Sequence, residues 1–296
     1  MMVLQSLADG ILIGGVYAAI GIGLSLAYGV MGVVNWSHGE TLMMSMYLAL
    51  FLTKYAGFDP YATIIVTAVV MAAYGFILQR FIFNNILEKT SKPTINILLF
   101  TAGLGLTISS LANMIFGGEA YTALTRYTNK SIRIHFGDEL LLISTPKLIS
   151  FCIAILATFG LYVFIQRTET GRAIRATSQD RSTAQLMGVN SNKVFCVAFS
   201  ISLALVGIAG SLLIPFYPVY PYVGSVFSFK SFIIVALGGK GNIPGALIGG
   251  LTIGIIEKIG GYFVSDNMAQ IIIFILFIAI LLFKPDGLLS GWKKAK

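Results

Sequence analysis

The segment Val34–Glu40, with the sequence VNWSHGE, carries the side chains best suited to chemistry in an otherwise apolar stretch. Asn35, Ser37, His38 and Glu40 fall within six residues between two apolar runs. An ionised side chain at the centre of a membrane span costs about 2.5–3.5 kcal/mol on insertion scales. The segment is therefore either an ordinary turn outside the membrane or a functional break that borders an aqueous translocation path. The span lengths leave both interpretations open.

His38 and Glu40 also form the kind of pair that a proton relay uses in an ion-coupled secondary carrier. A relay needs further acceptors through the other spans. The remaining charges lie elsewhere, because Arg80 is near the end of a span and Glu257–Lys258 are expected near the outer face. The relay is therefore the less favoured interpretation.

The sequence contains no grouping of residues for catalysis by the chain itself. Lys240 follows two glycines but precedes Gly241, where a phosphate-binding loop needs Ser or Thr, so no ATP site is expected. No Ser, Cys or Asp arrangement favours hydrolysis within the membrane, and Cys152 and Cys196 lack a metal-ligand spacing. We therefore expect no enzyme activity, no metal and no cofactor bound by this chain.

The composition indicates which elements position these residues. Hydrophobic residues make up 56% of the 296 and charged residues only 11%, whereas a soluble domain carries about a quarter charged residues. The apolar runs are continuous rather than alternating, which favours membrane-spanning helices over a barrel. The net charge of +8 is interpreted as cytoplasmic lysine and arginine, not as a nucleic-acid surface. Spans are expected near residues 10–30, 41–55, 61–83, 94–116, 148–165, 194–214 and 268–283.

Two shorter apolar segments, Gly224–Leu237 and Gly245–Ile256, flank the glycine-rich stretch GGKGNIPG. Each is too short for a comfortable span, which predicts a re-entrant or broken helical hairpin over residues 224–256. With this hairpin, the chain is expected to be an all-α polytopic membrane protein of about eight transmembrane helices. These helices form a single domain over residues 1–296.

Glycines four residues apart recur within the apolar runs. This spacing lets two membrane helices approach closely, either within the chain or against a partner. The pairs are Gly10/Gly14, Gly245/Gly249 and Gly250/Gly254.

The distribution of basic residues predicts the orientation. If residues 170–188 and the C-terminal tail are cytoplasmic, thirteen of the twenty lysine and arginine residues lie inside, as the positive-inside rule requires. The N-terminus is then outside and the C-terminus inside, provided that residues 224–256 enter and leave on one side. The outer basic residues are Lys54, Arg126, Lys130, Arg133, Lys147, Lys230 and Lys258.

The polar stretch Thr170–Gly188 separates two apolar runs and favours two short helices. Asp180 is a good N-cap, and Gly188 is placed to end the second helix. Helices this short are marginal in water, so they need a surface to pack against. We therefore interpret residues 166–193 as a cytoplasmic docking loop, with a basic loop at lipid headgroups as the alternative.

The longest outer segment, residues 117–147, mixes aromatic, basic and acidic side chains. It is either an external cap or docking surface, or a solvated loop, and composition alone does not separate these interpretations.

Together, four stretches resemble the branched-chain amino acid permeases of ABC transporters. VNWSHGE is similar to that family's Asn-x-Ala-His-Gly-Glu element, with Ser37 in place of Ala. LGGKGNIPGALIGG resembles its glycine-rich element, and KPDGLLSG resembles its terminal Arg-Pro-x-Gly-Leu-x-Gly, with Lys284 in place of Arg. The loop TGRAIRAT and the following Ala184-xxx-Gly188 also fit, although the Glu and first Ala of the usual loop motif are absent. The length is closer to the shorter, LivH-like type than to the LivM-like type.

The resemblance implies a type II-like importer fold and a heteromeric complex in a bacterial or archaeal inner membrane. Its partners would be a second related permease, two cytoplasmic ATPases that bind ATP and Mg, and a periplasmic or lipid-anchored binding protein. The chain itself would move branched-chain amino acids by alternating access, surrounded by the lipid bilayer. Urea or short amides are the alternative substrates within the family.

The resemblance also implies roles for particular residues. The translocation path would be bordered by the polar segment and by the glycine-rich break: Asn35, Ser37, His38, Glu40, Gly238, Gly239, Gly241, Pro244 and Gly245. The ATPase would be contacted through the docking loop: Gly171, Arg172, Arg175, Asp180, Arg181, Ala184 and Gly188.

Overall fold

The computed structural model describes residues 2–128, 130–136, 139–284 and 287, and within them the chain is mostly helical. One long helix, α1 (Met2–Met31), runs through the middle of the bundle and is buried along most of its length. It forms because residues 10–31 contain neither proline nor a charged side chain. The other elements are α2 (His38–Ala56), α3 (Ile64–Leu78), the π-helical turn η1 (Gln79–Phe83), α4 (Asn84–Lys89), α5 (Pro93–Phe116), β1 (Ser131–Phe136), β2 (Glu139–Ser144), α6 (Thr145–Arg167), α7 (Glu169–Gln179), α8 (Arg181–Leu186), α9 (Ser191–Leu213), α10 (Val223–Gly238), α11 (Ile243–Phe263) and α12 (Asp266–Phe283).

Six of the described helical segments are long and apolar enough to cross a bilayer. α10 and residues Asn267–Phe283 of α12 are shorter apolar helices. The sequence predicted about eight spans and judged Gly245–Ile256 too short for one. That judgement was wrong, because Asn242 caps a continuous helix that extends to Phe263.

The segment of residues 117–147 corrects the all-α expectation, because it contains a two-stranded antiparallel sheet. Strands β1 and β2 pair in register from Ser131 opposite Ser144 to Phe136 opposite Glu139. Isoleucine alternates with basic residues in β1, a strand pattern that the surrounding apolar runs obscured. The Gln5 side chain donates to the Leu142 carbonyl over 2.6 Å and so ties the sheet to the start of α1.

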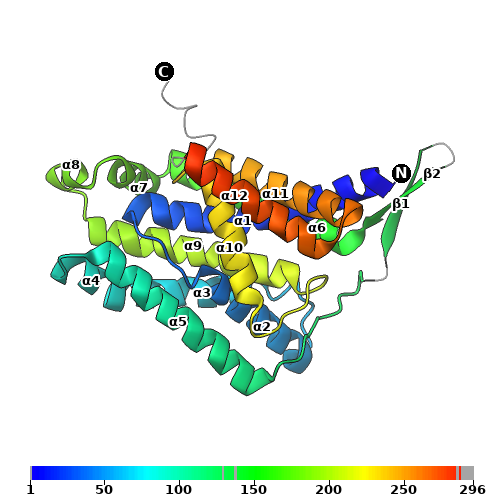
Figure 1. The fold of residues 1–296 in the computed structure, drawn as a ribbon. Helices are drawn as coiled ribbons and strands as arrows, with labels where there is room; N and C mark the ends of the chain where they lie inside the picture. The colour runs from blue at the N-terminus through cyan, green and yellow to red at the C-terminus, as the bar shows by residue number, and fades with distance from the viewer. Residues whose placement is uncertain (1, 129, 137–138, 285–286, 288–296) are drawn as a thin grey trace.

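The molecule has two ends, which Figure 1 shows on opposite sides. The N-terminus of α1 lies with the β-hairpin at one end, and α7 and α8 lie at the other. We call these the hairpin end and the α7–α8 end. The tail that the sequence predicts to be cytoplasmic, and its KPDGLLSG motif after Lys284, lie outside the described residues except for Gly287.

A glycine seam joins α1 to α11, which run antiparallel. A Cβ atom on Gly10 would overlap the backbone of Gly254, and one on Gly250 would overlap the backbone of Ala18. Gly14 is equally close to α11. The close helix contact predicted from the glycine spacing is confirmed, and here it is a contact within the chain.

Helices α10 and α11 form a hairpin whose turn, residues 239–242, lies at the α7–α8 end. The Gly241 N–H donates to the Ser25 carbonyl, and the Ser25 hydroxyl donates to the Gly239 carbonyl. Both hydrogen bonds fasten the turn to the last third of α1.

Candidate functional site

The polar segment predicted from VNWSHGE lies in the interior of the bundle. Helix α1 ends at Met31, Gly32 adopts a φ of +67°, and α2 begins only at His38. We call residues 32–37 the α1–α2 break. The side chains of Asn35, Ser37, His38 and Glu40 are all buried.

Local hydrogen bonds explain why α2 begins where it does. The Asn35 Oδ1 atom accepts from the Ser37 N–H at 3.1 Å and from the Ser37 hydroxyl at 2.8 Å. This arrangement turns the chain at the position where a helix needs a cap. The His38 Nε2 atom lies 3.0 Å from the Ile20 carbonyl oxygen. Because that carbonyl only accepts, Nε2 carries the proton and the ring is fixed against α1.

Helix α10 holds the other side of the α1–α2 break. The Ser228 hydroxyl accepts from the Gly39 N–H at 2.9 Å. The same hydroxyl lies 3.1 Å from both the Trp36 carbonyl and Glu40 Oε2, so its proton serves one of the two. A Cβ atom on Gly39 would overlap the Gly224 carbonyl, which is why the backbones can approach so closely.

Trp36 is the member of VNWSHGE whose side chain is presented outward. Its backbone N–H donates to Thr101 Oγ1 over 3.0 Å, yet the residue is 40% exposed. The indole packs on Phe232 and Phe229, with ring centroids 5.1 and 6.1 Å apart. The buried polar side chains around it hold this exposed ring in place, and sequence reasoning did not single it out.

The docking loop folds into the two helices that its sequence predicts. Thr168 caps α7 by accepting from the Gly171 N–H at 3.0 Å. Asp180 caps α8 through the N–H groups of Ser182 and Thr183. Hydrogen bonds from the Thr183 and Ser182 side chains lower the pKa of the Asp180 carboxyl to about 2. Gly188, at a φ of +86°, lies just beyond the end of α8.

The structure divides the predicted docking residues into two groups. Gly171 and Ala184 are buried, and Arg175 donates to the Ile165 carbonyl at the end of α6. These residues hold α7 and α8 on the bundle. The outward residues are Arg172, Asp180, Arg181 and Gly188, and the Arg181 guanidinium lies 5.0 Å from the centre of the Phe195 ring.

Two apolar side chains at the end of α8 were not in the predicted set. Leu186 is 87% exposed and Met187 is 81% exposed, although the loop around them is polar. Large apolar residues before a helix-ending glycine in a polar loop were the available signal. Exposed apolar side chains of this kind are typical of a surface that contacts another protein or a membrane.

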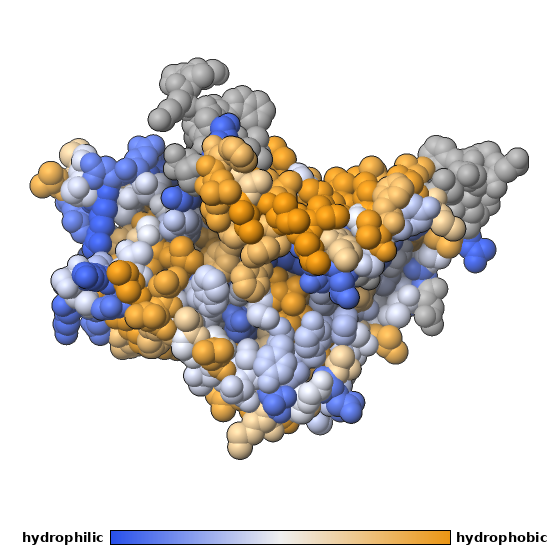
Figure 2. All heavy atoms as spheres, in the orientation of Figure 1, coloured by the Kyte–Doolittle hydropathy of each residue, from blue (hydrophilic) through white to orange (hydrophobic). Residues whose placement is uncertain are grey.

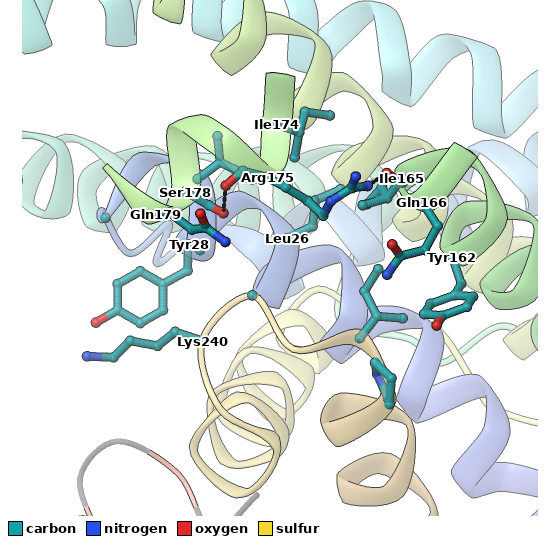
Figure 3. Close-up of a pocket in the computed structure, with 16 residues that line it drawn as sticks. Leu26, Tyr28, Tyr162, Ile165, Gln166, Ile174, Arg175, Ser178, Gln179 and Lys240 are labelled. Carbon is teal, nitrogen blue, oxygen red and sulfur yellow. Dashed lines mark hydrogen bonds between the residues drawn. The ribbon is translucent and has the colours of Figure 1, made fainter. Parts of the chain in front are cut away.

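A cavity of about 520 Å³ brings the docking loop and the glycine-rich break together at the α7–α8 end. Arg175 and Gln179 of α7 line it opposite Lys240, Gly241 and Pro244. In Figure 3 the Arg175 side chain points toward Ile165, while Tyr28 and Lys240 lie side by side. Gly239 lies in the turn, and Gly238 and Gly245 flank it at the ends of α10 and α11. The backbones of Gly238 and Gly245 pack directly on each other.

A buried ion pair joins α10, α11 and α1, where the sequence placed its members near the outer face. Lys230 is 5% exposed and Glu257 is 8% exposed, and the Lys230 ammonium lies 2.7 Å from Glu257 Oε2. The Tyr17 hydroxyl accepts from Lys230 at 2.9 Å and donates to Glu257 Oε1 at 3.2 Å. Tyr17 lies near the middle of α1, so these three residues, the ion-pair cluster, are deep in the bundle. Their spacing of 27 residues hid the pair from sequence reasoning.

The apolar spanning helices, the internal polar break and the exposed helical loop define the class of multi-span membrane proteins. Among the residues that the structure describes, no three His, Cys, Asp or Glu side chains come together as for a metal ion. Residues 6–281 match the family described as branched-chain amino acid transport system, permease component, and the chain belongs to that family.

Individual relatives place the chain within the family. It is 32% identical over 296 residues to the high-affinity branched-chain amino acid transport system permease protein LivH of Escherichia coli (strain K12), covering 97% of this chain and 95% of that protein. It is 26% identical over 219 residues to the probable permease LivM of Methanocaldococcus jannaschii, covering 63% of this chain and 59% of that one. The prediction of a LivH-like rather than LivM-like chain is confirmed. A solved chain titled PsaBC from Streptococcus pneumoniae in complex with Fab covers 99% of this chain and 95% of that chain at 15% identity, with a TM-score of 0.47, too low to support an argument.

Proposed function

We propose that this chain is the membrane-spanning permease subunit of a binding-protein-dependent ABC importer that moves branched-chain amino acids. The names of its relatives support this substrate class over urea and short amides. The chain works with a second related permease, two ATPase subunits that bind ATP and Mg, and an external binding protein. It contributes no ATPase site of its own.

The observation that carries this proposal is the exposed apolar pair Leu186 and Met187 at the end of α8. The pair is presented on a capped helix that buries only one face against the bundle. A chain without a nucleotide site needs a partner that hydrolyses ATP. The Leu186–Met187 pair fits a groove on such a partner. Arg172, exposed on α7, adds a positively charged side chain to the same docking loop.

The same loop is the route by which motion of the ATPases reaches the membrane helices. The cavity at the α7–α8 end separates α7 from the turn of residues 239–242. Gly239 and Gly241 have φ values of +88° and +69°, so this turn is held by backbone geometry rather than by bulky side chains. A push on α7 therefore acts on α10 and α11 together, which repacks the path for alternating access.

The translocation path is bordered by the two breaks. Asn35, Ser37, His38 and Glu40 build the wall of the α1–α2 break, and Gly238, Gly239, Gly241, Pro244 and Gly245 form the turn below it. Because the four polar side chains are buried, their role is to fix this wall. The solute meets backbone and aromatic surface, which suits an apolar side chain that must be released.

The proposed orientation puts the α7–α8 end in the cytoplasm and the β-hairpin outside an inner membrane. Arg172 and Arg181 then face the cytoplasmic ATPases, in agreement with the positive-inside rule. An external binding protein reaches the β-hairpin end.

The test is co-purification of the tagged chain from its native membrane, with identification of the proteins retained. The double variant Leu186→Ser/Met187→Ser should insert normally and lose at least tenfold of the retained ATPase. The matched control is Leu124→Ser, which changes another exposed leucine in the segment before the β-hairpin.

Full ATPase retention by the double variant would refute docking through α8. Uptake of leucine by proteoliposomes that contain this chain alone, driven by an ion gradient, would refute the importer assignment itself. Uptake that needs ATP and the co-purified subunits would support it.

A further inference from the structure

An apolar slot opens between α10, α12 and the α1–α2 break, next to the cavity that α7 lines, with which it shares Tyr28 and Lys240. Its volume is about 340 Å³. Phe229, Phe232 and Ala236 of α10 form one wall, and Phe277 and Leu281 of α12 form the other. The indole of Trp36 lies at the Phe229–Phe232 part of the slot.

The length of the slot matches half of a bilayer. From Phe229 to Gly238, the last residue of α10, the chain advances nine residues, which is about 14 Å at the helical rise of about 1.5 Å per residue. The hydrocarbon core of one leaflet is about 15 Å thick. A slot that begins at the membrane surface beside Lys240 therefore ends near the midplane beside Trp36.

The lining of the slot suits a hydrocarbon chain. It is almost wholly apolar, and Lys240 and Tyr28 contribute its polar groups.

The charge at one end of the slot selects the headgroup. Lys240 is exposed on the turn of residues 239–242, with its ammonium 5.3 Å from the centre of the Tyr28 ring. Figure 3 shows both side chains pointing to the same side. The Gly287 backbone packs against Gly239, so the end of α12 with Lys284 comes to the same mouth. Cations at a membrane surface attract anionic lipid headgroups.

The slot is continuous with a surface made for lipid. The exposed side chains of α12 in its membrane segment are apolar, among them Ile271, Phe274, Ile278 and Leu282. Figure 2 shows this apolar band along α12. A lipid chain can enter sideways from that surface.

We propose that the slot between α10 and α12 binds one acyl chain of an anionic phospholipid, with the phosphate of the headgroup held at Lys240. The lipid lies against Trp36 and so contacts the α1–α2 break directly. The lipid lies between α10 and α12. Along the chain, these two helices are connected through the turn of residues 239–242 and α11.

The experiment uses the complex as purified in detergent, stripped of lipid and then incubated with phosphatidylglycerol or phosphatidylcholine. Retained lipid is quantified by mass spectrometry. Wild type should retain more phosphatidylglycerol than phosphatidylcholine. Lys240→Gln should retain roughly fivefold less phosphatidylglycerol, the contribution of one lysine near an anionic surface, with phosphatidylcholine unchanged. The matched control is Lys92→Gln, another exposed lysine, from the α4–α5 connection.

A second variant tests the slot itself. Ala236→Trp fills it and should lower retention of both lipids about tenfold, whereas the control Leu106→Trp, on the exposed face of α5, should not. Equal retention by Lys240→Gln and Lys92→Gln, or by Ala236→Trp and Leu106→Trp, would overturn the proposal.

A photoreactive residue at Phe229 covers the case in which Ala236→Trp fails to fold. In native membranes it should form an adduct with lipid. An adduct with a polypeptide would show that a protein occupies the slot and would overturn the proposal.

Discussion

Two charged regions of this chain follow opposite rules, although both lie in a very apolar sequence. The ion-pair cluster of Tyr17, Lys230 and Glu257 is buried and fully connected. The α7–α8 loop keeps its charges in solvent, and the ion pair of Arg172 with Glu169 is long at 3.4 Å and exposed.

The difference shows which charges affect the stability of the fold and which affect binding to a partner. A buried charge without its partner costs several kcal/mol, so the interior pair is essential as a pair. An exposed pair contributes about 0–1 kcal/mol, so the loop can change its charges with little effect on folding. Interior charges should therefore control stability, and exposed ones should control docking.

The largest expected effect is the removal of one member of the ion-pair cluster. Lys230→Met leaves the Glu257 carboxylate buried without a cation and should lower the free energy of unfolding by about 3–5 kcal/mol. The double variant Lys230→Met/Glu257→Met removes both charges and should recover most of the lost free energy of unfolding. The remaining loss, about 1–3 kcal/mol, is the cost of leaving the buried Tyr17 hydroxyl without hydrogen-bond partners. Unfolding of the purified protein in detergent measures both.

Lys258→Met is the matched control, because Lys258 neighbours Glu257 and is more exposed. It should leave stability nearly unchanged. A double variant no more stable than the single one would show that the charges do not act as a pair.

The next effect concerns the close approach of α2 to α10. Gly39→Ala places a Cβ atom against the Gly224 carbonyl and should destabilise the protein by about 1–3 kcal/mol, as overpacked interiors do. Gly103→Ala on α5 meets no atom within 4 Å and should be neutral or slightly stabilising. The same unfolding assay compares them, and equal stability would mean that α2 and α10 are not in contact there.

An effect of similar size, confined to one helix, separates the two arginines of α7. Arg175 donates to the Ile165 carbonyl, so Arg175→Gln should loosen α7 by about 1.5–3 kcal/mol, the range for a hydrogen bond with a charged group. Arg172→Gln should leave α7 ordered and weaken only ATPase binding. Amide hydrogen exchange over residues 169–179 measures the loosening of α7, and co-purification measures ATPase binding. Identical exchange in the two variants would contradict the division.

The smallest effect is expected at Asp180. Its pKa of about 2 in the folded loop is below the ordinary value of 3.8, so its stabilising contribution is complete above about pH 4 and is lost as the pH falls through about 2. Docking should therefore show no pH dependence from this residue between pH 5 and 8. Asp180→Ala should speed amide exchange in α8, while Asp180→Asn should retain most of the protection. The measured quantity is the protection of the α8 amides relative to their intrinsic exchange rate at each pH. A protection that changes between pH 5 and 8 in the wild type, but not in the variants, would contradict the assignment.

Local patterns predicted the elements of this protein well where a single segment contains the whole cause. The caps of α7 and α8 depend on Thr168, Asp180 and Gly188 and on residues within a few positions of each. For the segment after α1, the sequence left a turn and a break open, and only the structure shows that Asn35, Ser37, His38 and Glu40 are buried. The strand pattern of β1 was present too, but apolar runs on both sides obscured it.

The sequence by itself determined that this chain spans a membrane and which family it belongs to, because composition and short motifs express these properties locally. Only the tertiary structure decided that Lys230 and Glu257 form a buried pair, that Trp36 is presented outward, and that Arg172 and Arg175 have different roles. Those facts depend on contacts between helices far apart in the chain. A side chain's burial and partner are set by packing across such contacts, and no pattern within one segment records them.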